Sequence, residues 1–168
     1  DLLVLVEPNR PLDTLRKYLA DLCADCRANC IPVGRNFHGY VESHVTALIY
    51  HAVSRYYGVV DRGTQLDFEE IIDMFSDSAK YNRAGKILEG RDAIRQFYFS
   101  ERTLVGHHTV ESIAVSGLKV HVNGVFNGKS VKEDAPRTLE FSDRWHFNTH
   151  GSVVDRHTYL SQGNAIAE

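Results

Sequence analysis

Residues 41–63 read VESHVTALIYHAVSRYYGVVDRG, and apolar side chains recur in this stretch at every third or fourth position. That spacing places the apolar residues on one face of an α-helix, where they can pack against a core. The apolar face comprises Val45, Leu48, Ile49, Ala52, Val53, Tyr56, Tyr57 and Val60. Gly63 ends the pattern, as glycine commonly does after a helix. The stretch predicts one long helix, and the rest of the fold must bury its apolar face.

The chain before this helix predicts another helical segment. It opens at Pro11, carries apolar residues at spacings of three and four, and ends near Cys30, before another proline and a glycine. With 168 residues the chain is long enough for one domain with a core and too short for two ordinary ones. We therefore expect an N-terminal helical extension at residues 1–40 and one domain at residues 41–168.

Two short helices and a series of strands are predicted after the long helix. Asp67 and Glu70 have capping-box spacing and open a helix that reaches Phe75. Gly90 precedes a third helix that carries Phe97. The remaining pattern predicts strands at residues 79–83, 107–115, 118–127, 137–147 and 152–160. Three helices followed by antiparallel strands indicate an α+β fold.

Four segments in this order resemble the SnoaL-like and ketosteroid-isomerase-like branch of the nuclear transport factor 2-like superfamily. They are Tyr56–Gly63, Phe68–Asp77, Leu88–Ile94 and Gly151–Tyr159. The branch includes polyketide cyclases, scytalone dehydratase and limonene epoxide hydrolase. The resemblance implies a cone-shaped, curved antiparallel sheet wrapped around three helices, here with an extra N-terminal helix, and a pocket open at one end. The same fold serves several reactions as well as pure binding, so it does not by itself fix the chemistry.

The resemblance also suggests catalytic positions. The aspartate base of ketosteroid isomerases falls on Asn82, whose amide accepts no proton at neutral pH. The strand histidine of scytalone dehydratase is matched by His108, with its ring expected to face the pocket. Polyketide cyclases have an aspartate near the last strand, where this chain has His157 and Thr158. We expect His108 to be the general base, with His157 or Tyr81 polarising a carbonyl group.

Histidines are numerous, with nine in the chain. An imidazole with its usual pKa near 6.5 can take up and return a proton near neutral pH, as enolisation, aldol closure or dehydration requires. His108, His146 and His157 are the candidates because each lies beside an apolar run of a predicted strand. The alternative for each is an ordinary surface or hydrogen-bonded strand histidine.

Aromatic side chains are the candidates for substrate binding, together with one histidine. They are Tyr57, Phe97, Trp145, His146 and Tyr159. Aromatic rings can orient an apolar ligand, and a tyrosine hydroxyl can donate a hydrogen bond to a forming enolate. The alternative is packing in the core. Asp61 and Asp77 are the carboxylates nearest the expected pocket mouth, where such residues usually serve turns or caps.

The cysteines Cys23, Cys26 and Cys30 have a spacing that permits a metal site. On a helix they extend the apolar face of their segment, and no fourth ligand lies nearby, so we expect buried thiols and no metal. Three is an odd number, which argues against a closed disulfide framework and favours the cytoplasm.

Several partner classes are excluded by the composition. The net charge is −3 and the charges are interspersed, which argues against nucleic acid. No apolar run approaches the roughly 20 residues of a membrane helix. Glycine-rich phosphate loops are absent, so no cofactor is expected. The expected ligand is a small hydrophobic molecule.

Two functions fit these observations. The first is a cofactor-independent cyclase, dehydratase or isomerase that uses histidine-based proton transfer on an apolar, oxygenated, polyketide-like molecule. The alternative is a non-catalytic module that binds a hydrophobic ligand or dimerises. We expect a homodimer through the outer face of the sheet, because Val120, Val122 and Phe126 on one parity and Val125 on the other put apolar side chains on both faces. The alternative cover for that face is residues 1–40.

Overall fold

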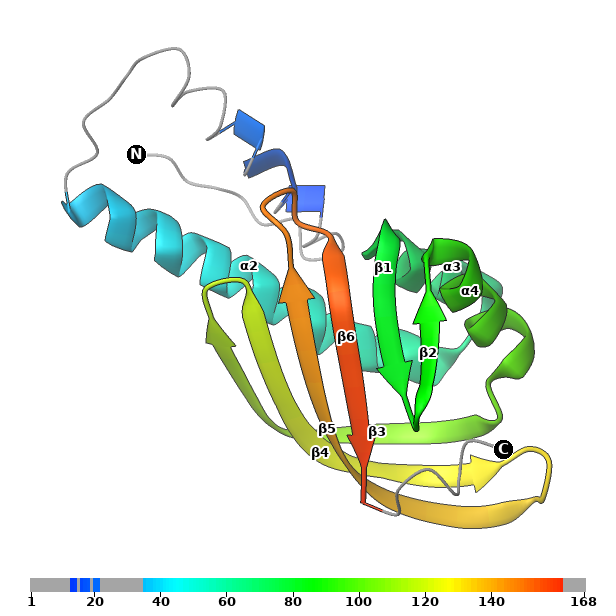
Figure 1. Ribbon diagram of the computed structural model, residues 1–168. Coiled ribbons are helices and arrows are strands. Elements are labelled where there is room, and N and C mark those ends of the chain that lie inside the picture. The colour runs from blue at the N-terminus through cyan, green and yellow to red at the C-terminus, as the bar shows by residue number, and fades with distance from the viewer. Residues whose placement is uncertain (1–12, 15, 19, 22–34, 162–168) are drawn as a thin grey trace.

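The structure is a computed structural model that describes residues 13–14, 16–18, 20–21 and 35–161, with side chains from residue 44 onward in the last range (Figure 1). The described residues among 13–21 are helical, in agreement with the helix predicted there. Cys23, Cys26 and Cys30 lie outside the described residues. The expectation of buried, metal-free thiols stays a prediction.

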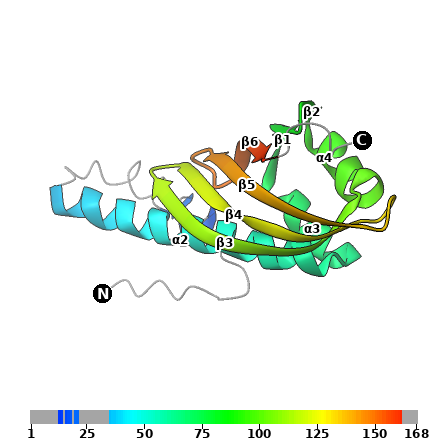
Figure 2. The ribbon, with the colours of Figure 1, turned by 90° about the horizontal axis from the view of Figure 1, so that it is seen from below.

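The long predicted helix is α2 (Arg35–Arg62), which lies along the concave side of the sheet (Figures 1 and 2). Its apolar face is buried, with Ile49 and Val53 fully shielded from solvent. These side chains form one core with the inward residues of the strands. The pattern of residues 41–63 therefore identified the element around which the domain is built.

The next helix, α3 (Gln65–Asp73), has a different cap from the one predicted. Thr64 is the N-cap: its hydroxyl accepts a hydrogen bond from the Asp67 backbone at 3.2 Å, and its own backbone N–H donates to the Asp67 carboxylate at 3.0 Å. Asp67 is thus the third helical residue of a capping box, and the predicted pairing of Asp67 with Glu70 is wrong. Arg62 also binds the Asp67 carboxylate, at 2.5 Å, so this carboxylate is held from both sides of the turn.

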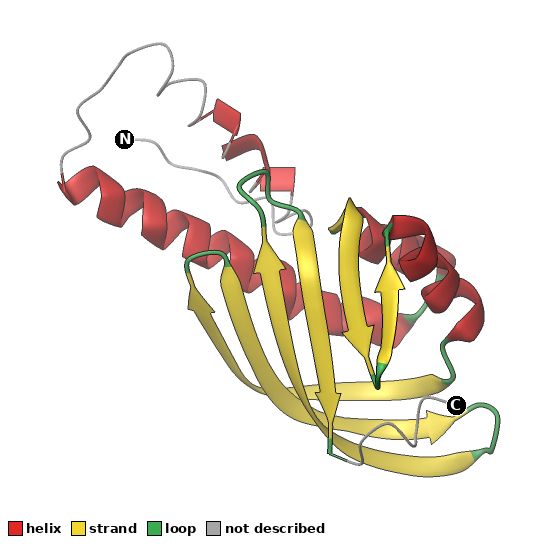
Figure 3. Ribbon diagram, in the orientation of Figure 1, coloured by secondary structure: helices red, strands yellow, loops and turns green. Residues whose placement is uncertain are grey.

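Six strands form one curved sheet in the order β2-β1-β6-β5-β4-β3 (Figure 3). The strands are β1 (Phe75–Arg83), β2 (Lys86–Glu89), β3 (Leu104–Ser116), β4 (Lys119–Ser130), β5 (Ala135–Phe147) and β6 (Val153–Leu160). Neighbouring strands are antiparallel except for β1 and β6, which run parallel. Strand β2 was not predicted, because four residues are too few to show an alternating pattern.

The third predicted helix divides into α4 (Arg91–Gln96) and a π-helical turn, η1 (Phe97–Glu101). A π-turn inserts one residue into the helical repeat and changes which side chains face inward. Here it buries Tyr98 and leaves Phe97 half-buried at the edge of the core.

The outer face of β4 is polar apart from the half-buried Val125, contrary to the apolar face expected from the sequence. Val120, Val122 and Phe126 all point inward and are at most 3 % exposed. The alternate positions of β4, such as Lys119 and His121, are exposed. The expected reason for a homodimer is therefore missing, and the oligomeric state stays a prediction. Among the described residues, no helix combines the length and apolar character needed to cross a membrane.

Gly124 is required by the close approach of three strands. A Cβ atom at this position would lie 2.3 Å from the Thr109 carbonyl oxygen and 2.8 Å from the Phe141 ring. We expect Gly124→Ala to lower the free energy of unfolding by about 1–3 kcal/mol, as overpacking does. Urea unfolding followed by circular dichroism measures the change.

The matched control is Gly58→Ala, because nothing lies within 4 Å of a Cβ atom there and the residue is inside α2. Alanine favours the helix over glycine, so this variant should be more stable by about 0.5–1 kcal/mol. Equal stability of the two variants would contradict the packing argument.

Candidate active site

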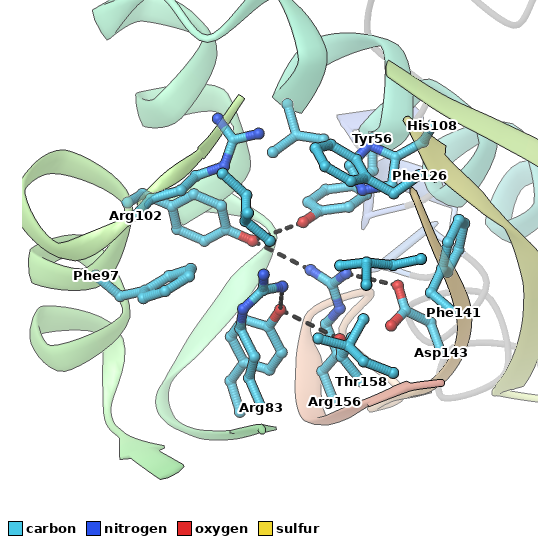
Figure 4. A pocket seen from close by; sticks show the side chains of 16 residues that line it. Tyr56, Arg83, Phe97, Arg102, His108, Phe126, Phe141, Asp143, Arg156 and Thr158 are labelled. Atoms are coloured by element: carbon cyan, nitrogen blue, oxygen red, sulfur yellow. Dashed lines mark hydrogen bonds and ion pairs between the residues drawn. The ribbon is translucent and has the colours of Figure 1, made fainter. Parts of the chain in front are cut away.

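A narrow cavity lies between the concave face of the sheet, the end of α2 and the turn η1 (Figure 4). It is lined by Tyr56, Val60, Tyr81, Arg83, Phe97, Tyr98, Arg102, Leu104, His108, Phe126, Leu139, Phe141, Asp143, Arg156, Thr158 and Leu160. Its free volume is about 30 Å³, enough for roughly two water molecules. Side chains at the wall must therefore move to admit a larger ligand.

His108 and Asp61 form a hydrogen-bonded pair at the wall of this cavity. The His108 Nδ1 atom lies 2.5 Å from Asp61 Oδ1, and the His108 backbone N–H donates to Asp61 Oδ2 at 2.8 Å. Both side chains are largely buried, with 18 % and 11 % of their surfaces exposed. The two contacts fix the imidazole, and the short Nδ1 contact favours the tautomer with its proton on Nδ1. The Nε2 atom then carries the free lone pair.

Three aromatic rings enclose the imidazole of His108. Its centroid lies 4.9 Å from that of Phe126, 5.3 Å from Phe141 and 5.5 Å from Tyr57. These rings exclude water from the sides of the imidazole. Among the described residues, no hydrogen-bond partner occupies the Nε2 atom, so the base can meet a ligand.

Arg156 and Asp143 form a second pair, buried deeper in the same cavity. The Arg156 Nη2 atom donates to Asp143 Oδ2 at 2.6 Å, and the side chains are 3 % and 1 % exposed. The guanidinium carbon also lies 3.9 Å from the centroid of the Trp145 ring, 4.3 Å from Tyr56 and 4.6 Å from Tyr81. Burial alone would raise the pKa of the Asp143 carboxyl, but the charge of Arg156 and the hydrogen bond from Tyr57 bring it below its usual value.

Tyrosine hydroxyls extend this pair across the cavity. Tyr57 donates to Asp143 at 2.7 Å, and Tyr98 accepts from Arg156 at 3.1 Å and shares a hydrogen bond of 2.7 Å with Tyr56. Burial raises the pKa of Tyr98 well above its usual value, and the neighbouring Tyr56 adds to this effect. Tyr98 is therefore a neutral hydroxyl that can donate a proton in a hydrogen bond.

Tyr81 differs from the other tyrosines because two cations lie near it. Burial acts to raise its pKa, but the charges of Arg156 and Arg83 outweigh burial and lower it below the usual value. Its hydroxyl lies 3.2 Å from the Thr158 hydroxyl. Of the tyrosines in the cavity, it is the one best suited to stabilise negative charge on a ligand oxygen.

The cavity contains some of the residues that the sequence suggested. Tyr81, Phe97 and His108 line it, and His108 faces inward as expected. Tyr57 and Trp145 are buried beside it, where they hold Asp143 and Arg156.

Four other suggested residues lie elsewhere. Residue alternation puts His146, His157 and Tyr159 on the outer face of β5 and β6, where the rings of His157 and Tyr159 stack at 3.8 Å. Burial and the charge of Arg144 lower the pKa of His157 there. Asn82 does not line the cavity, and its buried Oδ1 atom has no partner among the described residues.

Two charged residues of the site, Asp143 and Arg156, were missed from the sequence, and Asp61 was placed near the pocket mouth but interpreted as a turn or cap residue. Asp143 and Arg156 share the inward parity of Trp145 and Thr158, so each is an ionisable side chain at a core position. Asp61 is an acidic residue in the last turn of α2, where the helix dipole disfavours it. Ionisable residues at core positions of strands, and an acidic residue at the C-terminal end of a helix, were the features of the sequence that could have indicated the site.

The fold agrees with a comparison against protein families. The model of the SnoaL-like domain matches residues 53–156, from within α2 to within β6. The chain belongs to the SnoaL-like domain family. No curated protein matches the sequence.

Solved structures show the same fold as this SnoaL-like domain. SalBIII, an epoxide hydrolase/cyclase-like enzyme studied for pyran ring formation in the polyether salinomycin, is 18% identical with a TM-score of 0.59, over 67% of this chain and 90% of that chain. An NTF2-like protein of unknown function from Exiguobacterium sp. 255-15 is 19% identical with a TM-score of 0.55, over 66% and 98%. A protein described as a SnoaL-like polyketide cyclase, from Shewanella putrefaciens CN-32, is 13% identical with a TM-score of 0.57, over 68% and 90%. At these identities the likeness concerns the fold.

Removing one member of the Arg156–Asp143 pair should unfold much of the protein. Asp143→Ala leaves a buried guanidinium without its counter-ion, so we expect a loss of about 3–5 kcal/mol in the free energy of unfolding. The double variant Asp143→Leu with Arg156→Met removes both charges and should be much closer to the wild type. Urea unfolding at pH 7 measures both; a double variant as unstable as Asp143→Ala would contradict this account.

The same pair predicts a dependence of stability on pH. Because the pKa of Asp143 is lower in the folded protein than its ordinary value of about 3.9, its contribution to stability is complete above that value. It is lost as the pH falls through the lowered folded pKa. Between pH 5 and pH 2.5 the wild type should therefore lose more unfolding free energy than the double variant. Parallel losses in urea titrations of the two proteins would show that Asp143 contributes nothing to this dependence.

Proposed function

We propose that this SnoaL-like domain is a cofactor-independent enzyme that transfers a proton on an apolar, oxygenated small molecule, in the manner of a cyclase, dehydratase or isomerase. The observation that carries the proposal is the His108–Asp61 pair, which places an oriented imidazole at the wall of a cavity that has both apolar and polar lining residues. A histidine oriented in this way is the commonest general base of enzymes near neutral pH.

The proton moves between the ligand and His108. The Nε2 lone pair takes a proton from a carbon next to a carbonyl group, the electron pair of the C–H bond forms the C=C bond of an enolate, and the π pair of the C=O bond moves to the oxygen. Asp61, bonded to Nδ1, stabilises the imidazolium that results. The imidazolium then returns the proton, at another carbon in an isomerisation or to a departing hydroxyl in a dehydration. In a cyclisation the enolate carbon instead attacks a second carbonyl carbon of the same molecule, the π pair of that carbonyl group moves to its oxygen, and the oxygen takes the proton from the imidazolium of His108.

The negative charge on the ligand oxygen needs hydrogen-bond donors that are already in place. Tyr81 and Tyr98 present hydroxyls at the cavity, and Arg156 supplies a positive charge behind them. Donors fixed before the reaction lower its barrier because they need no rearrangement. His146, His157 and Tyr159 take no part in this proposal, since they lie on the outer face.

The solved relatives support this class of reaction. SalBIII is described as an epoxide hydrolase/cyclase-like enzyme with a role in pyran ring formation, and the Shewanella putrefaciens protein is described as a polyketide cyclase. Each has a fold like that of this chain, which makes ring closure on an oxygenated carbon chain a reasonable reaction to test first. The fold is shared more widely than the reaction, so the evidence for chemistry stays with His108 and Asp61.

The second candidate function is a non-catalytic binding module. It is favoured by the small free volume of about 30 Å³ and by the number of cavity hydroxyls already bonded to one another. In this case His108 would serve only to hold the end of α2 against β3.

Deuterium exchange separates the two candidates without knowledge of the natural substrate. The probe is 2-tetralone, an apolar ketone with acidic C–H bonds, in deuterated buffer at neutral pH, followed by proton NMR. The wild type should accelerate exchange, and His108→Asn should reduce this acceleration by about 10²- to 10⁴-fold. Asp61→Asn should reduce it less, because the base remains but loses its orientation.

His107→Asn would not serve as a control, because the His107 Nδ1 atom lies 3.9 Å from Asp61 Oδ2. The matched control is His121→Asn, since His121 is exposed on the outer face of β4. It should exchange deuterium as fast as the wild type. No acceleration by the wild type, or an equal loss in the two histidine variants, would decide in favour of the binding module.

A further inference from the structure

Positive charge exceeds negative charge at the wall of the cavity. Three arginines line it, Arg83, Arg102 and Arg156, whereas Asp143 is the one carboxylate among the lining residues. Asp143 is already bonded to Arg156. Figure 4 shows Asp143 beyond Arg156, on the side away from Arg83. Two guanidinium groups are therefore left at the cavity without a carboxylate.

Arg83 has few partners for a half-buried guanidinium. It ends β1, its guanidinium carbon lies 5.3 Å from the centroid of the Phe97 ring, and its Nη1 atom reaches the Tyr81 hydroxyl at 3.4 Å. No carboxylate of the described residues lies within ion-pair distance of it. A guanidinium has five N–H donors, and those that the protein leaves unbonded on Arg83 are available to a ligand. The group is arranged to receive an acceptor that the protein does not supply.

Arg102 repeats this arrangement at another part of the wall. It follows η1, and its guanidinium carbon lies 5.9 Å from the centroid of the Phe68 ring, again with no carboxylate partner among the described residues. Other cations around the same helices do have such partners: Arg62 binds Asp67, Lys86 binds Glu101 and Arg95 binds Glu69. Arg144 on the outer face also has no carboxylate within ion-pair distance among the described residues, so what distinguishes Arg83 and Arg102 is that they line the cavity.

We propose that the ligand of this cavity carries a carboxylate, which Arg83 binds while Arg102 adds positive potential. This inference rests on the proposed function, since it names the substrate class of the same cavity. The planar guanidinium matches a carboxylate with two parallel hydrogen bonds. Leu139, Phe141 and Leu160 line the same cavity and can take the hydrocarbon part.

Binding in this way also orients the ligand. A carboxylate held at the end of β1 turns the apolar body of the molecule toward the strands and His108. The position of the acid group relative to the reacting carbon would then decide which C–H bond meets the Nε2 atom. Arg83 is accordingly a residue of substrate specificity, and His108 remains the base.

Calorimetric titration with phenylacetate and its methyl ester tests the proposal at pH 7, where the acid is ionised. The two probes share an apolar body and differ in charge. The wild type should bind the acid at least about tenfold more tightly than the ester, the ratio expected for one charge-assisted contact. Arg83→Gln should remove this preference, and Arg83→Lys, which keeps the charge but not the planar group, should keep part of it.

Two further variants show where the acid binds and separate this proposal from the catalytic one. Arg144→Gln makes the same charge change on the outer face, beside Lys119, His121 and His146, and should keep the preference for the acid. His108→Asn should bind the acid within about twofold of the wild type and yet lose deuterium exchange. Equal binding of acid and ester by the wild type, or a preference that Arg83→Gln retains or Arg144→Gln abolishes, would overturn the proposal. Those results leave the exchange experiment, and with it the proposed function, unaffected.

Discussion

The buried ion pair of Arg156 and Asp143 is the interaction on which the rest of the structure depends. Its atoms are removed from water almost completely, so neither charge is tolerable unless the other is in place. The surrounding rings meet this need in two ways, since Trp145, Tyr56 and Tyr81 face the guanidinium and Tyr57 donates to the carboxylate. Aromatic rings that the sequence suggested as contacts for a hydrophobic ligand are therefore in large part in contact with the guanidinium of Arg156.

This arrangement also explains how one cavity can hold tyrosines whose pKa values are shifted in opposite directions. Tyr98 lies where burial dominates and raises its pKa, whereas Tyr81 lies where the charges of Arg156 and Arg83 outweigh burial and lower its pKa. His108 is paired with a carboxylate of its own, Asp61. An acid, a base and an oxygen-binding group can therefore stand close together without neutralising one another.

Helices and strands with a long periodic pattern of apolar residues could be predicted from the sequence. Contacts between residues far apart in the sequence could not. The spacing in residues 41–63 was enough for α2, and alternation was enough for β4, β5 and the inward position of His108. Alternation also forbids Trp145 and His146 from facing the same side, so one of that pair had to be outside the site. Asp61 and His108 are 47 residues apart, and only the packing of α2 on β3 brings them together. A π-turn and a four-residue strand leave no periodic pattern at all.

Three residues near the end of α2 connect parts of the domain that are otherwise separate. Tyr56 reaches the turn η1 through Tyr98, Tyr57 reaches β5 through Asp143, and Asp61 reaches β3 through His108. Because an α-helix is stiff over so short a distance, these three contacts move as one body. A ligand that enlarges the cavity by displacing this end of the helix would disturb the imidazole, the ion pair and the π-turn at the same moment. Opening of the cavity and alignment of its proton-transfer groups are thereby made mechanically inseparable.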